Sequence, residues 1–170
     1  MINLLRNKGY SLKNVSAEFS ESVSIEQVKV KSERVYDYHN DSLRFNATFP
    51  GKPLVTTSNW EESELRLIYR DFGQGNTYVV EVYPRDDDAT MEELASIFIA
   101  SPLNSPIRKV TLDNGGEAFE GISDSYPEGL SWMRLMLGED SLLVLKAYGG
   151  NKFMNSPRAQ RFFDRVSFND

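Results

Sequence analysis

His39 is the single histidine of the chain, and its neighbours supply the residue types of a hydrolytic site. The segment His39-Asn40-Asp41-Ser42 places an imidazole, a carboxyl group and a hydroxyl group close together in the sequence. A catalytic triad needs these groups to converge from separate segments, and adjacency gives the wrong geometry. The chain also has no G-x-S-x-G nucleophile elbow. We therefore predict that His39 is a turn residue between two strands and that the chain has no catalytic residue.

Carboxyl groups are the second possible source of chemistry. The run Arg85–Asp88, followed by Glu92 and Glu93, offers oxygen ligands for a hard cation. The run lacks the spacing of an EF-hand, with no Gly at the sixth loop position and no Glu at the twelfth. Negative charge before a helix complements the positive end of the helix dipole. We therefore expect a solvated loop here, with no metal and no cofactor.

A further acidic group comprises Glu61, Glu62 and Glu64. Paired carboxylates perform glycoside hydrolysis, so a small hydrolase that uses acidic residues is an alternative function. Its signature would be a concave pocket with two acidic groups and a perturbed pKa. Gly73-Gln74-Gly75 lies between two predicted strands and opens no helix, so we interpret it as a turn and not as a phosphate loop.

Three aromatic residues are candidates for binding. Trp60 stands among polar residues, and Tyr126 precedes a proline in a loop. Trp132 lies in a predicted strand, at alternate positions with Leu130, Arg134 and Met136. Aromatic side chains often anchor interfaces between molecules. The alternative is that each ring packs over the edge of a sheet. Trp60, Tyr126 and Trp132 are therefore the predicted binding residues.

Length and composition favour a single globular domain. The chain has 170 residues, 40% of them hydrophobic, and we expect one α+β domain at residues 25–170 after an N-terminal extension, 1–24, that is weakly structured or docked. The 19 basic and 25 acidic residues give a net charge of −6, which disfavours binding to nucleic acids and adhesion to anionic membranes. The absence of cysteine excludes disulfides and thiolate metal sites.

The chain shows no membrane span and no export signal. It has no run of about 18 apolar residues, and its N-terminus lacks the apolar core of about 7–15 residues that a signal peptide needs. We expect a soluble protein that is cytoplasmic, or extracytoplasmic after removal of a signal. We also expect a monomer or a weak oligomer.

Hydrophobic periodicity predicts several strands and two helices. Thr90 and Glu93 form a capping box for one helix, and Ser156 with Pro157 begins another that carries Phe162, Phe163 and Val166. Short turns connect most strands, so the sheet should be antiparallel. We expect strands within Ile25–Tyr38 and at Leu43–Phe49, Leu65–Phe72, Thr77–Tyr83, Arg108–Leu112, Glu117–Ile122, Leu130–Leu137 and Leu142–Tyr148.

Several short motifs carry a resemblance to a known group. Phe45–Pro53 reads F-N-A-T-F-P-G-K-P and resembles the F-x-x-x-F-P-G-K-P opening of a group of small uncharacterised bacterial domains. Val110–Glu117, Arg134–Leu145 and Ala159–Phe168 resemble later elements of the same pattern, in the same order. The resemblance covers about residues 43–168, and Arg165 stands where the pattern often has Ser. Residues 1–40 have no clear counterpart.

These domains are similar to the PsbP-like extrinsic subunits of photosystem II and to the Ran-interacting Mog proteins. The resemblance implies an α/β/α sandwich, in which an antiparallel sheet is flanked by helices. It also implies a non-catalytic binding or accessory protein with a protein or small-molecule partner. A cell-envelope accessory protein whose signal has been removed is a further alternative.

Overall fold

Antiparallel strands dominate the part of the chain that the structure, a computed structural model, describes. The described residues are 35–57, 64–85, 88–99, 106–125, 129–154 and 156–169. All of these residues belong to one compact unit, Arg34–Asp170. The boundary predicted near residue 24 lies outside the described residues and stays a prediction.

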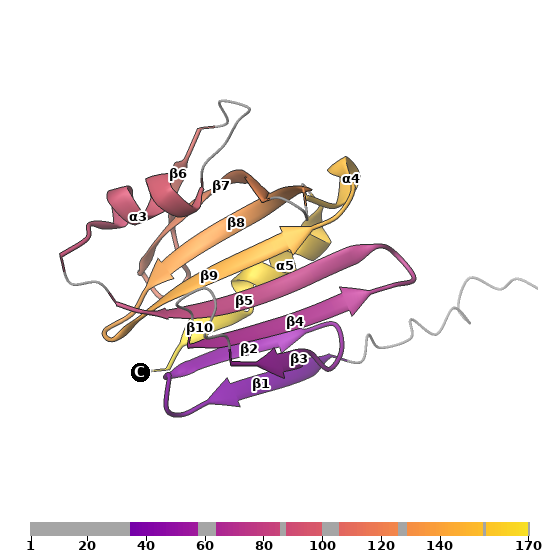
Figure 1. The fold of residues 1–170 in the computed structure, drawn as a ribbon, viewed down its shortest axis with the longest axis horizontal. Helices are drawn as coiled ribbons and strands as arrows, with labels where there is room; N and C mark the ends of the chain where they lie inside the picture. The colour runs from indigo at the N-terminus through magenta and orange to yellow at the C-terminus, as the bar shows by residue number, and fades with distance from the viewer. Residues whose placement is uncertain are drawn as a thin grey trace, which may run out of the picture. The chain divides into compact units, whose positions relative to one another are not determined.

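The described elements follow one another in the order shown in Figure 1. The helices are α3 (Met91–Phe98), α4 (Asn151–Met154) and α5 (Pro157–Asp164). The strands are β1 (Tyr36–Asn40), β2 (Phe45–Phe49), β3 (Leu54–Thr56), β4 (Leu65–Asp71), β5 (Asn76–Pro84), β6 (Arg108–Thr111), β7 (Glu117–Ser125), β8 (Gly129–Leu137), β9 (Ser141–Tyr148) and β10 (Val166–Phe168).

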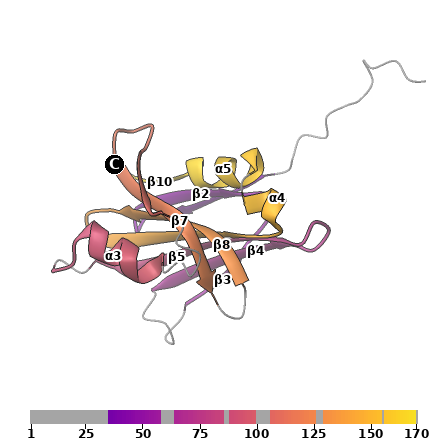
Figure 2. The same cartoon turned by 90° about the horizontal axis from the view of Figure 1, so that it is seen from above.

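The strands form two antiparallel sheets. The large sheet has the order β3-β4-β5-β9-β8-β7-β6, and the small sheet has the order β1-β2-β10. Figure 2 shows the small sheet and α5 on one side of the large sheet, with α3 on the other side. The large sheet is therefore covered mainly by a second sheet on one face and by a short helix on the other.

The main core lies between the two sheets. Phe45, Ala47 and Phe49 alternate with more exposed residues along β2, so one face of this strand is dry. Phe162 of α5 packs against Phe49 and Tyr78, with ring centroids 5.4 and 5.1 Å apart. Burial of these large rings is the main source of stability on this face of the large sheet.

A second core lies beneath α3. Leu94 and Ala95 of the helix are buried in a cluster with Met133, Leu135 and Val144 of the large sheet. The central strand β9 contributes buried residues to both cores, as expected for a strand that is apolar on both faces.

The predicted capping box of α3 is confirmed. The Glu93 amide donates to the Thr90 hydroxyl, and the Glu93 carboxylate accepts from the Thr90 amide at 2.9 Å. The hydrogen bond from the Thr90 amide, followed by that from its hydroxyl, lowers the pKa of Glu93 below its ordinary value. None of the described helices has the length and apolarity needed to cross a bilayer.

The antiparallel α+β arrangement agrees with the sequence prediction, but the predicted α/β/α sandwich overstated the helical layers. The layer behind the large sheet is a second sheet joined by one helix, and not a helical layer. The prediction also missed β3 and α4, and it placed Val166 in the last helix, whereas Val166 begins β10. The first described strand, Tyr36–Asn40, begins inside the range predicted for it and ends two residues beyond that range.

Glu81 is a fully buried carboxylate on the large sheet. Its two oxygens lie 2.9 Å from Arg66 Nε and 2.7 Å from Lys146 Nζ, and Arg66 is its direct cross-strand partner. The Tyr83 hydroxyl donates to the second oxygen at 3.2 Å. A buried charge of this kind is tolerated because opposite charges surround it, and removing it leaves the two cations uncompensated.

We expect Glu81→Gln to lower the free energy of unfolding by about 3 kcal/mol, because Arg66 and Lys146 lose their counter-charge in a partly buried setting. Urea denaturation followed by circular dichroism measures this change. The control is Glu117→Gln, which breaks an exposed ion pair with Lys109 and should cost less than about 1 kcal/mol. Equal costs for the two variants would contradict the account of Glu81.

Candidate functional site

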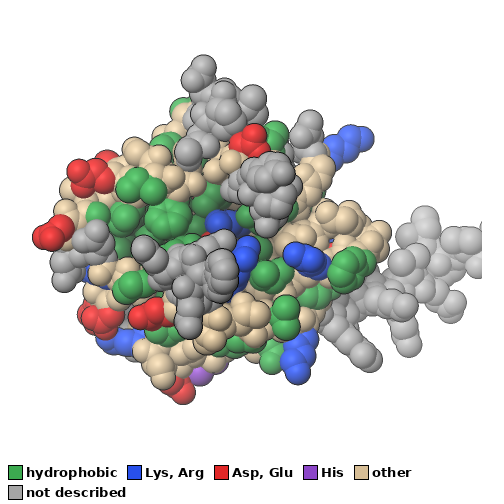
Figure 3. Space-filling view, in the orientation of Figure 1, with side chains coloured by type: hydrophobic (Ala, Val, Ile, Leu, Met, Phe, Trp, Pro, Cys, Tyr) green, Lys and Arg blue, Asp and Glu red, His purple; other side chains and the backbone are tan. Residues whose placement is uncertain are grey.

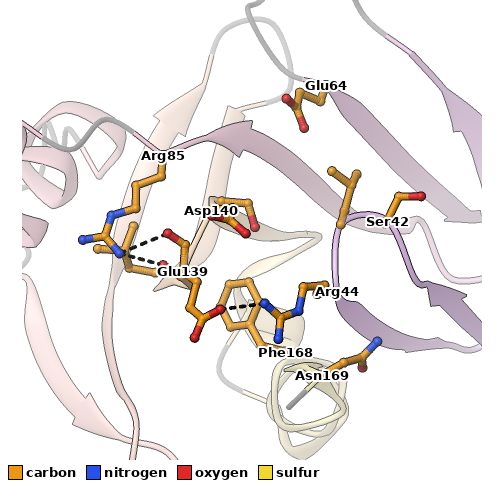
Figure 4. Close-up of a pocket in the computed structure, with 12 residues that line it drawn as sticks. Ser42, Arg44, Glu64, Arg85, Glu139, Asp140, Phe168 and Asn169 are labelled. Atoms are coloured by element: carbon orange, nitrogen blue, oxygen red, sulfur yellow. Dashed lines mark hydrogen bonds and ion pairs between the residues drawn. The ribbon is translucent and has the colours of Figure 1, made fainter.

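A cavity of about 760 Å³ lies at one end of the molecule, where the two sheets meet. The turn between β1 and β2, the turn between β8 and β9, the ends of β4 and β5 and the C-terminal residues all contribute to it (Figure 4). The lining residues are Ser42, Leu43, Arg44, Glu64, Arg85, Leu137, Gly138, Glu139, Asp140, Ser141, Phe168 and Asn169.

Arg44 enters the cavity from a strained backbone position. It has φ 51°, in the left-handed region that non-glycine residues seldom adopt. The Leu43 amide donates to Asn40 Oδ1 at 2.9 Å, and the Asn169 amide donates to the Arg44 carbonyl at 2.7 Å. These bonds hold the turn, and the guanidinium reaches Glu139 Oε2 at 2.6 Å.

Arg85 fixes the opposite side of the cavity. Its Nη1 donates to the carbonyls of Gly138 and Glu139 at 3.1 and 3.2 Å, and its backbone amide donates to the Asp140 carbonyl at 3.0 Å. Figure 4 shows Arg85 and Arg44 approaching the β8–β9 turn from two sides. Two arginines that are 41 positions apart in the sequence therefore hold one turn between them.

Close packing of Phe168 determines the shape of the β8–β9 turn. A methyl group at Gly138 would lie 2.5 Å from Phe168 Cε1, so the strand can approach the ring only because residue 138 is glycine. The Gly138 amide donates to the Ser141 carbonyl at 2.8 Å and closes the turn.

The cavity carries more negative than positive charge. Arg44 and Arg85 give two positive charges against the three negative charges of Glu64, Glu139 and Asp140, a balance of 2 − 3 = −1. Within the described residues, the side chains of Glu64 and Asp140 form no ion pair, whereas Glu139 is held by Arg44. The charged groups are partly exposed and can exchange their present partners for those of a bound molecule.

Trp132 is the one predicted binding residue that the structure describes; Trp60 and Tyr126 lie outside the described residues. The Trp132 ring is half-buried and meets Phe163 edge-on, with centroids 4.9 Å apart and planes at 82°. It belongs to the main core and lines none of the cavity described above. A binding role for these three residues stays a prediction.

His39 is part of a strand, so the interpretation as a turn residue was wrong. It lies in β1 opposite Asn46 of β2. Its Nδ1 contacts the Asn46 side chain and its Nε2 lies 2.6 Å from Asp41 Oδ1. Both ring nitrogens are therefore occupied, and neither is left for a serine hydroxyl. Hydrogen bonding to Asn46, and then to Asp41, raises the pKa of His39 above 6.5.

The acidic segment before α3 is only partly described, because Asp86 and Asp87 lie outside the described residues. Among the residues that the structure does describe, no three His, Asp or Glu side chains form a group that could hold a metal ion. Glu93 instead serves the helix cap. Of the group Glu61, Glu62 and Glu64, Glu64 is described and lines the cavity.

Sequence reasoning did not identify Arg44, Arg85, Glu139 and Asp140 as members of one site. Arg85, Glu139 and Asp140 lie just beyond predicted strands, whereas Arg44 lies at the start of one, and an antiparallel sheet brings alternate turns to the same end. The signal was therefore present in the topology, but the position of the small sheet relative to the large one was needed to bring Arg44 to Glu139.

Comparison with known proteins gives a fold but not a family. No protein-family model matches the chain, and no curated protein matches it either. Among solved structures, the described architecture is that of a PsbP-like domain. One such structure is the solution structure of cyanobacterial PsbP (CyanoP) from Synechocystis sp. PCC 6803, which matches with a TM-score of 0.55 at 10% identity, over 82% of this chain and 95% of that chain. The likeness agrees with the resemblance found in the sequence motifs.

We expect His39 to titrate above pH 6.5 in the folded protein, because its hydrogen bonds to Asn46 and Asp41 favour the protonated ring. Its contribution to stability is then fully present below pH 6.5 and is lost as the pH rises through the raised pKa. NMR titration of the ring protons measures this value. Asn46→Ala should move the pKa toward 6.5, and a wild-type value at or below 6.5 would contradict the described contacts.

Gly138→Ala should lower the free energy of unfolding by about 1–3 kcal/mol, because the added methyl group forces Phe168 or the β8–β9 turn to move. Gly150→Ala is the matched control, since nothing lies within 4 Å of a methyl group there. Thermal unfolding of both variants checks this expectation, which fails if the two variants are equally stable.

Proposed function

We propose that this chain is a non-catalytic accessory protein that binds a charged partner in the cavity between the β1–β2 and β8–β9 turns. The observation that carries the proposal is that Arg44 and Arg85 both bind the β8–β9 turn, Arg44 through the Glu139 carboxylate and Arg85 through backbone carbonyls. Charged groups arranged in this way determine the orientation and specificity of a partner more than its raw affinity. The PsbP-like fold is consistent with this role, although the fold alone does not identify a function.

The chemistry of the lining supports binding over catalysis. The cavity contains two hydroxyl groups, those of Ser42 and Ser141, but the described lining has no imidazole that could act as their general base. Arg44 pairs with Glu139, and Arg85 donates to backbone carbonyls. Such groups can exchange hydrogen bonds with a partner without transferring a proton.

A comparison of binding by two double variants tests the proposal. The full-length chain captures its partner from cells that naturally contain it, and the purified partner is then titrated against Arg44→Ala/Glu139→Ala. We expect affinity to fall about tenfold or more, which corresponds to about 1.4 kcal/mol. The control is Lys109→Ala/Glu117→Ala, which removes an exposed ion pair elsewhere and should leave affinity unchanged. Equal affinity of the cavity variant and wild type would exclude the cavity as the site.

A carboxylate-based hydrolase is the second candidate function, and the presence of Glu64 and Asp140 in one cavity favours it. This candidate requires turnover of a glycoside or ester by the wild-type chain. It further requires that Glu64→Gln or Asp140→Asn abolish turnover without weakening substrate binding. Under the accessory-protein proposal, neither wild type nor variant turns over any such substrate.

A further inference from the structure

Phe72 is the most exposed large hydrophobic residue among those that the structure describes. It lies at the tip of the β4–β5 hairpin and is 89% exposed, compared with 64% for Leu54 and 69% for Ile97. Figures 1 and 2 both show this hairpin reaching beyond the neighbouring strand ends, at the end of the molecule that also carries α4. An aromatic ring at the tip of a protrusion is presented to any surface that approaches this end.

The hairpin turn that carries Phe72 is rigidly built. Asp71 accepts from the Gly75 amide through its carbonyl at 2.7 Å and from the Gly73 amide through its carboxylate at 3.1 Å. Gly75 supplies the positive φ, 68°, that the turn requires. Arg158 of α5 contacts the side chains of both Asp71 and Gln74, so the turn is joined to the body of the domain. Because the turn is already ordered, binding through Phe72 would cost little backbone entropy.

Three basic residues lie at this end of the molecule. Arg70 precedes the turn, Arg158 contacts it, and Lys152 lies on α4, whose Phe153 packs against Tyr78 of β5. Within the described residues, Arg70 and Lys152 form no ion pair. We call Arg70, Phe72, Lys152 and Arg158 the basic tip.

Among the described residues, two acidic side chains lie at the end of the sheet that carries the basic tip. Asp71 pairs with Arg158 at 3.5 Å and offsets its charge, so the basic tip is left with the charges of Arg70 and Lys152. Asp124 lies at the same end of the sheet but on β7, and the strand order separates it from Arg70 by four strand spacings, about 19 Å. That distance exceeds the Debye length of about 8 Å at physiological salt, so Asp124 is largely screened.

Among the described residues, carboxylates outnumber cations at the cavity end of the molecule, away from the basic tip. Glu139 and Asp140 lie at the cavity end, away from the basic tip, as do Glu92 and Glu93 of α3 (Figure 1). On the face in Figure 3, acidic side chains gather mostly on the side that carries α3, and basic ones lie toward the middle and the opposite side. The net charge of −6 does not describe the surface that the basic tip presents.

We propose that the basic tip docks on an anionic lipid bilayer, with Phe72 inserted among the lipids and Arg70 and Lys152 next to the phosphates. Each basic residue near an anionic surface strengthens adhesion, and one buried aromatic ring adds apolar burial. A protein interface buries about 800 Å² on each partner, whereas insertion of one exposed ring among lipids needs no such area. This inference goes beyond the proposed function and does not depend on the cavity.

Vesicle sedimentation with the full-length chain tests the inference. We expect binding to vesicles with about one quarter phosphatidylglycerol in phosphatidylcholine, and none to pure phosphatidylcholine. Binding should disappear between about 0.05 and about 0.5 M salt. Phe72→Ala and the pair Arg70→Glu/Lys152→Glu should each lower the partition coefficient about tenfold or more.

Two matched controls distinguish the basic tip from exposure in general. Ile97→Ala removes an exposed hydrophobic side chain of α3, and Arg108→Glu reverses an exposed charge on β6, so both should bind vesicles like wild type. The cavity variant Arg44→Ala/Glu139→Ala should also bind like wild type, which separates this test from that of the proposed function. Failure to bind anionic vesicles at low salt, equal binding to both kinds of vesicle, or full binding by Phe72→Ala would each overturn the inference. Recognition of an acidic protein by the basic tip, without vesicle binding, would do the same.

Discussion

The packing of the small sheet and α5 on one face of the large sheet is the interaction on which the other features depend. Phe45 and Phe49 of β2 are fully buried there, and Phe162 packs against both Phe49 and Tyr78 of β5, the neighbour of the central strand. Because these contacts fix the small sheet, the β1–β2 turn is held next to the β8–β9 turn. Arg44 can therefore reach Glu139, from which it is 95 positions distant in the sequence.

The buried charged side chains of the described domain form ion pairs with one another or with neighbouring side chains of the same chain. Glu120 and Arg134 form an ion pair at 2.6 Å, with both side chains about 95% buried. The Arg134 guanidinium also lies 5.3 Å from the centre of the Phe163 ring. A buried pair of this kind contributes little net stability but penalises alternative packings that would separate the two charges. The partly exposed ion pair Arg44–Glu139 can be exchanged at lower cost, which is what a binding surface requires.

Local features of the fold were predictable from the sequence. The capping box of α3 involves Thr90 and Glu93, three positions apart, so its geometry follows from the sequence alone. The alternation along β2 likewise predicted which side chains are buried. By contrast, Leu54–Thr56 form a strand whose residues are all exposed, and no burial pattern marks it. Val166 continues a helical pattern, yet the chain leaves the helix at Arg165 and pairs with β2 instead.

The site was less predictable than the fold. Trp132 was selected because it is aromatic; its ring packs on Phe163, and a binding role for it stays a prediction. Residues of the cavity are common surface types in turns, and only the packing of two sheets brings them together.

Hydrogen–deuterium exchange on the full chain, with and without its purified partner, tests the central claim most directly. The account predicts slower exchange in the turns at residues 41–44 and 138–140 when the partner is bound. Unchanged exchange in both turns, with protection elsewhere in the described domain, would contradict it.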